Sequence, residues 1–275
     1  MITVAPKGKR MKKSMISLIW LGLLSCILAS CGPSSSHQNL QFTDSKSIIG
    51  GNDLVYVPKS LTNFREETPS EDLLDSIGLI HSGCTATHIG NNIMITAGHC
   101  IQAKFFGFHK DLSCNKSLLT SWGVRGSYKG YLNSRCVRII AAENSIERDF
   151  AFIKVDNAPR SQFNLYTGGE PELNRDMTIY SHPMKRPLQW SKKCKNLGRK
   201  DLGQWNSNRA YYLNRVHYSC DTEGGSSGAA VIDPDSYEIL AIHNSGIAFS
   251  GDMNKATSIK DILDKLDEEG VTLDL

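Results

Sequence analysis

Three residue types used together in nucleophilic catalysis occur in glycine-rich or strand-edge segments of this sequence. The stretch DTEGGSSGAAV places Ser226 and Ser227 between glycines, directly before an apolar run. NIMITAGHC ends an apolar run at His99, and RDFAFIKVD begins another at Asp149. A serine hydroxyl becomes nucleophilic when an imidazole takes its proton, and a buried carboxylate fixes the imidazole tautomer. The three segments together therefore predict a hydrolytic Ser-His-Asp site.

The glycines around the two serines have a chemical use of their own. They let main-chain N–H groups turn toward a developing oxyanion, an interaction worth ~10²–10³ in rate per donor. The same loop could instead be a phosphate-binding nest. That alternative requires a strand-loop-helix frame and a lysine, whereas apolar strand residues follow Gly228.

The elements that must position these residues read mostly as strands. The chain has 275 residues, 40% hydrophobic and 21% charged, which is typical of a globular protein with a sizeable core. Apolar residues at helical spacing predict one helix over residues 258–268. We therefore expect an all-β barrel or sandwich with a C-terminal helix. The expected strands include residues 55–57, 77–80, 93–95, 138–140, 150–153, 177–180, 229–232 and 239–242.

The motifs TAGHC, RDFAFIKV and GGSSGAAV occur in the order His, Asp, Ser, with spacings of 50 and 78 residues. They resemble the signatures of chymotrypsin-fold serine proteases. The resemblance covers residues 48–275 and implies two six-stranded antiparallel β-barrels. His99 and Asp149 would come from the first barrel and Ser227 from the second.

The family pattern Gly-x-Ser-Gly distinguishes the two serines. Ser227 fits the pattern, because a glycine lies two residues before it and another directly after it, whereas Ser226 is followed by a serine. The resemblance thus implies Ser227 as the nucleophile and the N–H groups of Gly225 and Ser227 as the oxyanion hole. The proline often found three residues after the nucleophile is Ala230 here.

The resemblance gives two conflicting signals about the substrate side chain that enters the S1 pocket. Thr222 and His243 match the threonine and histidine that bind a carboxylate in the glutamyl endopeptidase branch, and Gly246 would leave the pocket mouth open. Asp221 instead occupies the position where digestive trypsins keep the aspartate that binds Arg or Lys. Preference for Glu and preference for Arg or Lys both remain open, and His243 could be no more than a packed imidazole.

Activation is expected to differ from that of the digestive relatives. Their new N-terminus, which IIGG at residues 48–51 resembles, pairs its ammonium with an aspartate immediately before the nucleophile. That position is Ser226 here, so we expect that a free Ile48 amine is not required. A non-catalytic homologue that binds a partner is the alternative class, but the presence of all three catalytic residue types favours an endopeptidase. We expect it to act on proteins or peptides as a monomer and without a cofactor.

Cysteine usage is typical of an exported protein. Apart from Cys26 and Cys31, six cysteines remain, an even number that favours disulfides in an oxidising compartment. No C-x₂-C pair occurs, so we expect no metal site. The family resemblance implies a Cys84–Cys100 disulfide that holds the histidine loop. Proximity in sequence favours the remaining pairs, Cys114–Cys136 and Cys194–Cys220.

The first 30 residues have the pattern of a signal peptide. Five basic residues precede an uncharged apolar run over residues 15–28, which is short for a membrane span. Either Met1 or Met11 could be the start. Removing residues 1–30, with five basic and no acidic side chains, changes the net charge from +3 to −2. This weakens any nucleic-acid-binding interpretation.

LASC, which ends at Cys31, resembles a bacterial lipobox. We therefore expect lipidation at Cys31, with residues 31–47 as a Ser-rich flexible tether from a membrane and residues 48–275 as the protease domain. Gly32 follows the cysteine at the position where a retention signal has an aspartate. By analogy with bacterial lipoproteins, this favours the outer membrane. Secretion without a lipid is the alternative.

Overall fold

The computed structural model describes residues 48–275 except for residues 65, 102–105, 116–117, 200–213 and 247–252. The expected signal segment, Cys31 and the tether lie outside the described residues. Among the helices that are described, none is long and apolar enough to cross a membrane.

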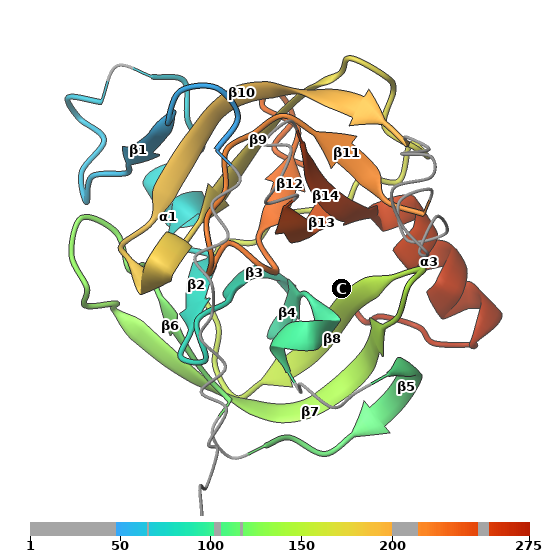
Figure 1. The fold of residues 1–275 in the computed structure, drawn as a ribbon. Coiled ribbons are helices and arrows are strands. Elements are labelled where there is room, and N and C mark those ends of the chain that lie inside the picture. Colours follow the sequence, from blue (N-terminus) through green and yellow to red (C-terminus); the bar gives the residue numbers. More distant parts are fainter. Residues whose placement is uncertain (1–47, 65, 102–105, 116–117, 200–213, 247–252) are drawn as a thin grey trace, which may run out of the picture. The chain divides into compact units, whose positions relative to one another are not determined.

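Antiparallel strands close the first barrel (Figure 1). Its sheet consists of β2 (Ile77–Ile80), β3 (Thr85–Gly90), β4 (Ile93–Thr96), β5 (Gly107–Leu112), β6 (Leu119–Trp122), β7 (Leu132–Asn144) and β8 (Asp149–Val155). The order β7-β6-β2-β3-β4-β8 returns to β7 through the β7–β8 pairing, and β5 adds to β7 outside this ring. The ring therefore has six strands.

The second barrel closes in the same way. Its sheet consists of β1 (Leu54–Tyr56), β9 (Asp176–Ser181), β10 (Gln189–Gly198), β11 (Val216–Tyr218), β12 (Ala230–Ile232), β13 (Ile239–Gly246) and β14 (Asn254–Ser258). The order β10-β11-β14-β13-β12-β9 returns to β10 through the β9–β10 pairing, and β1 adds to β10 outside the ring. Two six-stranded antiparallel barrels, expected from the motifs, are thus confirmed.

Strand alternation explains how the barrels pack against each other. On β8, Phe150 and Phe152 belong to a core cluster that also contains residues of β12 and β13, whereas Ala151 and Ile153 fill the first barrel. Successive side chains of a strand point to opposite faces, so one strand serves both cores. Burying each of these phenylalanines contributes about 1.5–3 kcal/mol. Because β8 begins at Asp149, this packing fixes the position of the predicted catalytic carboxylate.

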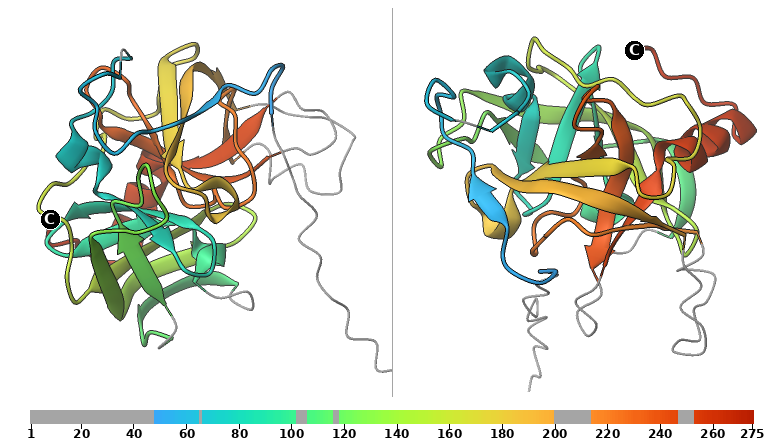
Figure 2. Two further views of the ribbon diagram at one scale, coloured as in Figure 1. Left: turned by 90° about the vertical axis from the view of Figure 1, so that its left-hand side faces the viewer. Right: turned by 90° about the horizontal axis from the view of Figure 1, so that it is seen from above.

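The C-terminal helix α3 (Ile259–Glu268) lies where the sequence predicted a helix (Figure 2). Ser258 caps it by accepting a hydrogen bond from the Asp261 N–H, and Ile259, Ile262 and Leu266 are buried. A four-residue helix, α1 (Glu71–Leu74), also forms and was not expected. Such a short segment carries too few residues to show helical periodicity.

Three disulfides join the cysteines of the described chain: Cys84–Cys100, Cys114–Cys136 and Cys194–Cys220. Each closes a loop of 16 to 26 residues, which stabilises the fold chiefly by restricting the unfolded chain. The first of them lies beside His99. It therefore links the start of β3 to the histidine segment.

Candidate active site

His99 lies in the 3₁₀ turn η1 (Gly98–Cys100), directly after β4. The turn packs tightly on the first barrel, because a Cβ atom at Gly98 would come within 2.0 Å of the Glu143 carbonyl oxygen. Glycine is therefore required at this position. The close approach and the neighbouring disulfide fix where the imidazole projects.

Asp149 holds His99 at two points. Its Oδ2 lies 2.7 Å from His99 Nδ1, and its Oδ1 accepts a hydrogen bond of 2.9 Å from the His99 main-chain N–H. Asp149 is buried, whereas the His99 side chain is 35% exposed. The carboxylate therefore favours a proton on Nδ1 and leaves Nε2 for acid-base chemistry.

The two groups shift each other's ionisation in opposite directions. Burial lowers the pKa of His99, but the hydrogen bond to Asp149 and its charge outweigh burial, so the pKa is raised above its ordinary 6.5. Burial would raise the pKa of Asp149, but the contacts with His99 and the charge of Arg215 lower it below 3.8. Asp149 is thus an anion at neutral pH beside an imidazole of increased basicity.

Ser227 lies in the turn between β11 and β12, and the first barrel holds this turn. The Thr85 N–H donates to the Ser227 carbonyl oxygen at 2.8 Å, and Thr85 Oγ1 donates to the Gly225 carbonyl at 3.0 Å. Gly228 has φ of +83°, and a Cβ atom there would lie 2.0 Å from Thr96 Oγ1. No larger residue fits at Gly228 without moving β3 and β4.

The Ser227 hydroxyl donates to the Asn244 carbonyl oxygen at 3.5 Å and not to His99. The Cys100 sulfur lies 3.7 Å from His99 Nε2 and 3.8 Å from the Ser227 carbonyl oxygen, so both residues adjoin the same disulfide. Catalytic hydrogen bonds are often long or misaligned before substrate binds. The structure therefore brings His99 and Asp149 into contact and places Ser227 nearby.

Gly225, predicted to contribute to the oxyanion hole, has a backbone conformation that favours glycine. Gly225 has φ of +96°, and a Cβ atom there would come within 2.7 Å of the His182 carbonyl oxygen. Among the described residues, the N–H groups of Gly225 and Ser227 donate to no protein acceptor. They are therefore available to an oxygen outside the chain.

Ser226 has a structural role. It is fully buried, and its hydroxyl lies 2.9 Å from the Ser181 hydroxyl. A neutral serine-serine contact thus occupies the place where activated digestive relatives have an ion pair. The expectation that a free Ile48 amine is not required stays a prediction.

The Asp221 carboxylate binds the N-terminal segment of the described chain. Its Oδ1 accepts a hydrogen bond from the Ile49 N–H and its Oδ2 one from the Asp53 N–H, both at 2.7 Å. Asp221 is only 2% exposed. Both oxygens are thus engaged by main-chain donors, an arrangement that the sequence did not indicate.

The remaining residues predicted for the S1 pocket lie together. Thr222 Oγ1 donates to Asn254 Oδ1 at 2.8 Å, and Gly246 faces Asn254 in the β13–β14 register. His243 Nδ1 lies 2.6 Å from the Tyr218 hydroxyl. Asn254, which is fully buried, was missed by the sequence analysis because no motif marks it.

His243 is electrically neutral in this environment. Burial is the main cause that lowers its pKa to about 3, and the nearby charges of His99 and Lys255 lower it as well. A hydrogen bond to the Lys255 main chain and the charge of Asp149 raise this pKa, but by less. Lys255 is itself buried, and burial and the charge of Arg215 lower its pKa to about 8. Two titratable nitrogen groups therefore lie deep in this part of the second barrel.

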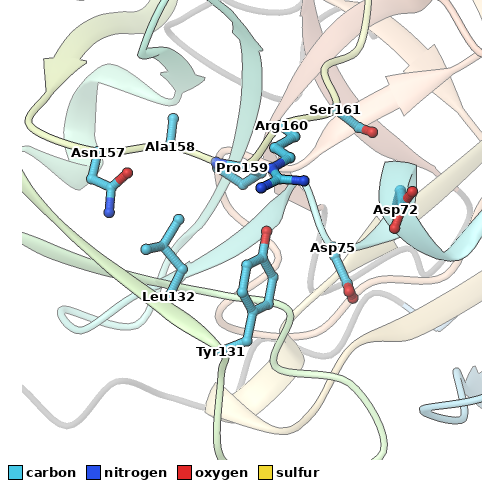
Figure 3. Close-up of a pocket in the computed structure, with 9 residues that line it drawn as sticks. All are labelled: Asp72, Asp75, Tyr131, Leu132, Asn157, Ala158, Pro159, Arg160 and Ser161. Carbon is cyan, nitrogen blue, oxygen red and sulfur yellow. The ribbon is translucent and has the colours of Figure 1, made fainter.

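Two other features do not provide an alternative site. Atoms of Cys84, His99 and Cys100 lie within 4.8 Å of one another, but the two sulfurs form a disulfide, and a disulfide sulfur is not the thiolate that metals bind. A cavity of about 500 Å³ between α1, the start of β7 and the segment after β8 holds no predicted site residue (Figure 3). Its lining is Asp72, Asp75, Tyr131, Leu132, Asn157, Ala158, Pro159, Arg160 and Ser161.

Two closed antiparallel barrels define the chymotrypsin-like architecture of serine proteases. The family model for the trypsin-like peptidase domain matches residues 84–242, more than half of the chain. This protein belongs to that family. No curated protein matches the sequence significantly.

Solved protease structures share the fold at low sequence identity. The structure of a Glu endopeptidase in complex with MPD is similar with a TM-score of 0.54 and 19% identity, covering 82% of this chain and 100% of the other. The active form of the Rv3671c protease from M. tuberculosis has a TM-score of 0.53 and 13% identity, covering 82% and 94%. Its inactive form gives 0.53 and 13%, covering 72% and 90%. At such low identities, the structural similarity supports the fold alone.

The Asp221 contact leads to a test with a matched control. Replacing Asp221→Ala removes the acceptor of the Ile49 and Asp53 N–H groups, which costs about 0.5–1.5 kcal/mol for each part-buried hydrogen bond. We expect lower thermal stability and faster limited proteolysis near residues 48–53. Asp53→Ala should change neither measurement, because Asp53 contributes its main chain and its side chain is exposed. Equal stability of the two variants would show that Asp221 does not anchor this segment.

Proposed function

We propose that this protease is a serine endopeptidase in which Ser227 is the nucleophile, His99 the general base and Asp149 the residue that orients His99. The observation that carries the proposal is the pair of hydrogen bonds that Asp149 accepts from His99, at 2.7 and 2.9 Å. The raised pKa of His99 supports this role, because a more basic imidazole accepts the serine proton more readily.

The proposed reaction proceeds through an acyl-enzyme. His99 Nε2 takes the proton of Ser227 Oγ as the oxygen attacks the scissile carbonyl carbon, and the Gly225 and Ser227 N–H groups receive the oxyanion. His99 then gives its proton to the leaving amine as the carbon-nitrogen bond breaks. A water molecule, deprotonated by His99, hydrolyses the ester and restores the Ser227 hydroxyl.

For the S1 pocket we favour a preference for Glu. Thr222 and His243 match in sequence the carboxylate-binding residues of the glutamyl endopeptidase branch, and the buried Lys255 adds positive charge near His243. The Tyr218 hydroxyl, 2.6 Å from His243 Nδ1, fixes the orientation of the imidazole ring. The fold similarity to a Glu endopeptidase agrees with this preference.

A preference for Arg or Lys is the second candidate, and Asp221 is its only support. Binding of a cationic side chain requires a carboxylate directed into the pocket. Here both Asp221 oxygens accept hydrogen bonds from the N-terminal segment at 2.7 Å. Their engagement there weighs against this candidate.

Serine catalysis can be separated from a purely binding function with a fluorophosphonate probe and matched serine variants. The folded wild-type protein should be labelled and Ser227→Ala should not, with a loss in kcat on the order of 10⁶. Asp149→Asn should lower kcat about 10⁴-fold. Ser226→Ala is the control and should keep the label and most of the activity. Labelling that survives in Ser227→Ala but disappears in Ser226→Ala would overturn the assignment, and an unlabelled wild-type protein would favour the binding homologue.

Specificity is tested by profiling the enzyme on a peptide library. We expect cleavage after Glu, reduced roughly 10–100-fold in His243→Ala, because a hydrogen bond to a charged group contributes about 1.5–3 kcal/mol. His88→Ala is the matched control, because His88 is a buried histidine of β3 bonded to the Ser161 carbonyl oxygen. It should lower stability without changing the preference. Cleavage after Arg or Lys that disappears in Asp221→Ser would refute the Glu assignment.

We further propose that the enzyme is exported and held on a membrane through a lipid at Cys31. The three disulfides support an oxidising compartment. Wild-type protein should incorporate labelled palmitate, show globomycin-sensitive processing and sediment with membranes. Cys31→Ala should abolish the label and release the protein, and Cys26→Ala should do neither. A Cys31→Ala protein that remained membrane-bound would contradict the anchor.

A further inference from the structure

Arg215 is a buried cation beside the catalytic pair. It lies immediately before β11, is 1% exposed and is among the largest fully buried side chains of the described protein. A guanidinium group is costly to bury unless its N–H groups are hydrogen-bonded. The partners of this group therefore indicate what the arginine does.

The guanidinium reaches both barrels. Its Nη1 donates to Thr257 Oγ1 on β14 and to Asn244 Oδ1 on β13, the latter at 3.2 Å. Its Nη2 donates to the Ser145 carbonyl oxygen at 2.9 Å, directly after β7 of the first barrel. One side chain thus connects two strands of the second barrel to the loop that precedes Asp149.

The same two side chains hold the main chain of Asp149. The Asp149 N–H donates to Thr257 Oγ1 at 3.1 Å, and Asn244 Nδ2 donates to the Asp149 carbonyl oxygen at 2.7 Å. Thr257 Oγ1 donates to Asn244 Oδ1 at 2.9 Å. The threonine oxygen therefore accepts from Asp149 and Arg215 while its proton goes to Asn244, which uses the full capacity of the hydroxyl group.

Arg215 also acts on the pair through its charge. It lowers the pKa of Asp149, which favours the anion, and it opposes protonation of His99. Among the described residues, the other charged or titratable groups that face His99 are Asp149 on β8 and His243 on β13. Lys255 on β14 acts on His243 and is itself affected by Arg215, while Glu143 on β7 pairs with Arg148.

We propose that Arg215 is a positioning residue of the proposed catalytic site: it locks Thr257 and Asn244 against the Asp149 main chain, joins the two barrels there and supplies the positive charge behind the carboxylate. It does not touch the reacting atoms. The inference rests on the proposed function of His99 and Asp149. Its two parts, geometry and charge, are separable by substitution.

The test compares Arg215→Met, which removes both the contacts and the charge, with Thr257→Val, which breaks the link to Asp149 but keeps the charge. Both variants should lower kcat about 10²-fold, with little change in KM, because misplacing a catalytic group by about 1 Å costs that much. The acid limb of the kcat/KM profile should lie at higher pH in Arg215→Met than in Thr257→Val, because only the former removes the charge that opposes His99 protonation. NMR titration of the His99 imidazole measures the same shift without turnover.

Arg125→Met is the matched control. Arg125 is a buried arginine of the first barrel, bonded to Asp75 at 2.9 Å and to the Pro58 carbonyl oxygen, and it has no contact with the triad. This variant should lose stability but keep kcat and the His99 titration of the wild type. If Arg215→Met does not fold, Thr257→Val decides the geometric part by kcat, and Arg215→Lys decides the role of the guanidinium, because a lysine cannot make all three contacts and should also lower kcat.

Folding of each variant is checked by thermal unfolding. The proposal is overturned if folded Arg215→Met keeps the wild-type kcat and the wild-type His99 titration, or if folded Arg215→Lys keeps the wild-type kcat. It is also overturned if Thr257→Val keeps wild-type kcat. Absence of any Ser227-dependent activity in the wild type would refute the proposed function instead. In that case an unchanged His99 titration in Arg215→Met would still refute the charge effect.

Discussion

The site depends on Asp149, whose two carboxylate oxygens both accept hydrogen bonds from His99. One oxygen fixes the main chain of His99 and the other fixes its ring, so the direction of Nε2 is determined by one side chain. A carboxylate can do this only if its own main chain does not move. The burial of Asp149 and the contacts of its N–H and carbonyl groups therefore matter as much as the carboxylate itself.

The two barrels contribute to this arrangement in different ways. Apolar side chains such as Phe150 and Phe152 supply most of the energy that holds the barrels together, but apolar contact is not directional. Polar contacts provide the direction, since the Thr85 N–H places the Ser227 carbonyl and Asn244 places the Asp149 carbonyl. Association and alignment are thus provided by separate sets of residues.

Local patterns in the sequence predicted much of the fold, because a strand or helix is visible within a window of a few residues. The strand at 150–153 and the helix at 258–268 are examples, and the motifs indicated that His99 follows one strand and that Asp149 begins another. Arg215 and Asp221 show where this reasoning stops. Arg215 contacts residues 29 and 42 positions away, and Asp221 binds amides 168 and 172 positions away, so neither role leaves a local signal.

The uncharged contact between Ser226 and Ser181 has a consequence for when such an enzyme becomes competent. If no ion pair with a newly cut terminus is needed, the loop around Ser227 would reach its form once the second barrel closes and the Cys84–Cys100 bond secures the histidine turn. If a free Ile48 amine is not required, as we expect, proteolytic cutting of a precursor is not the switch. Under the proposed export, oxidative folding would take its place, and a chain kept reduced inside the cell would stay inactive until it leaves.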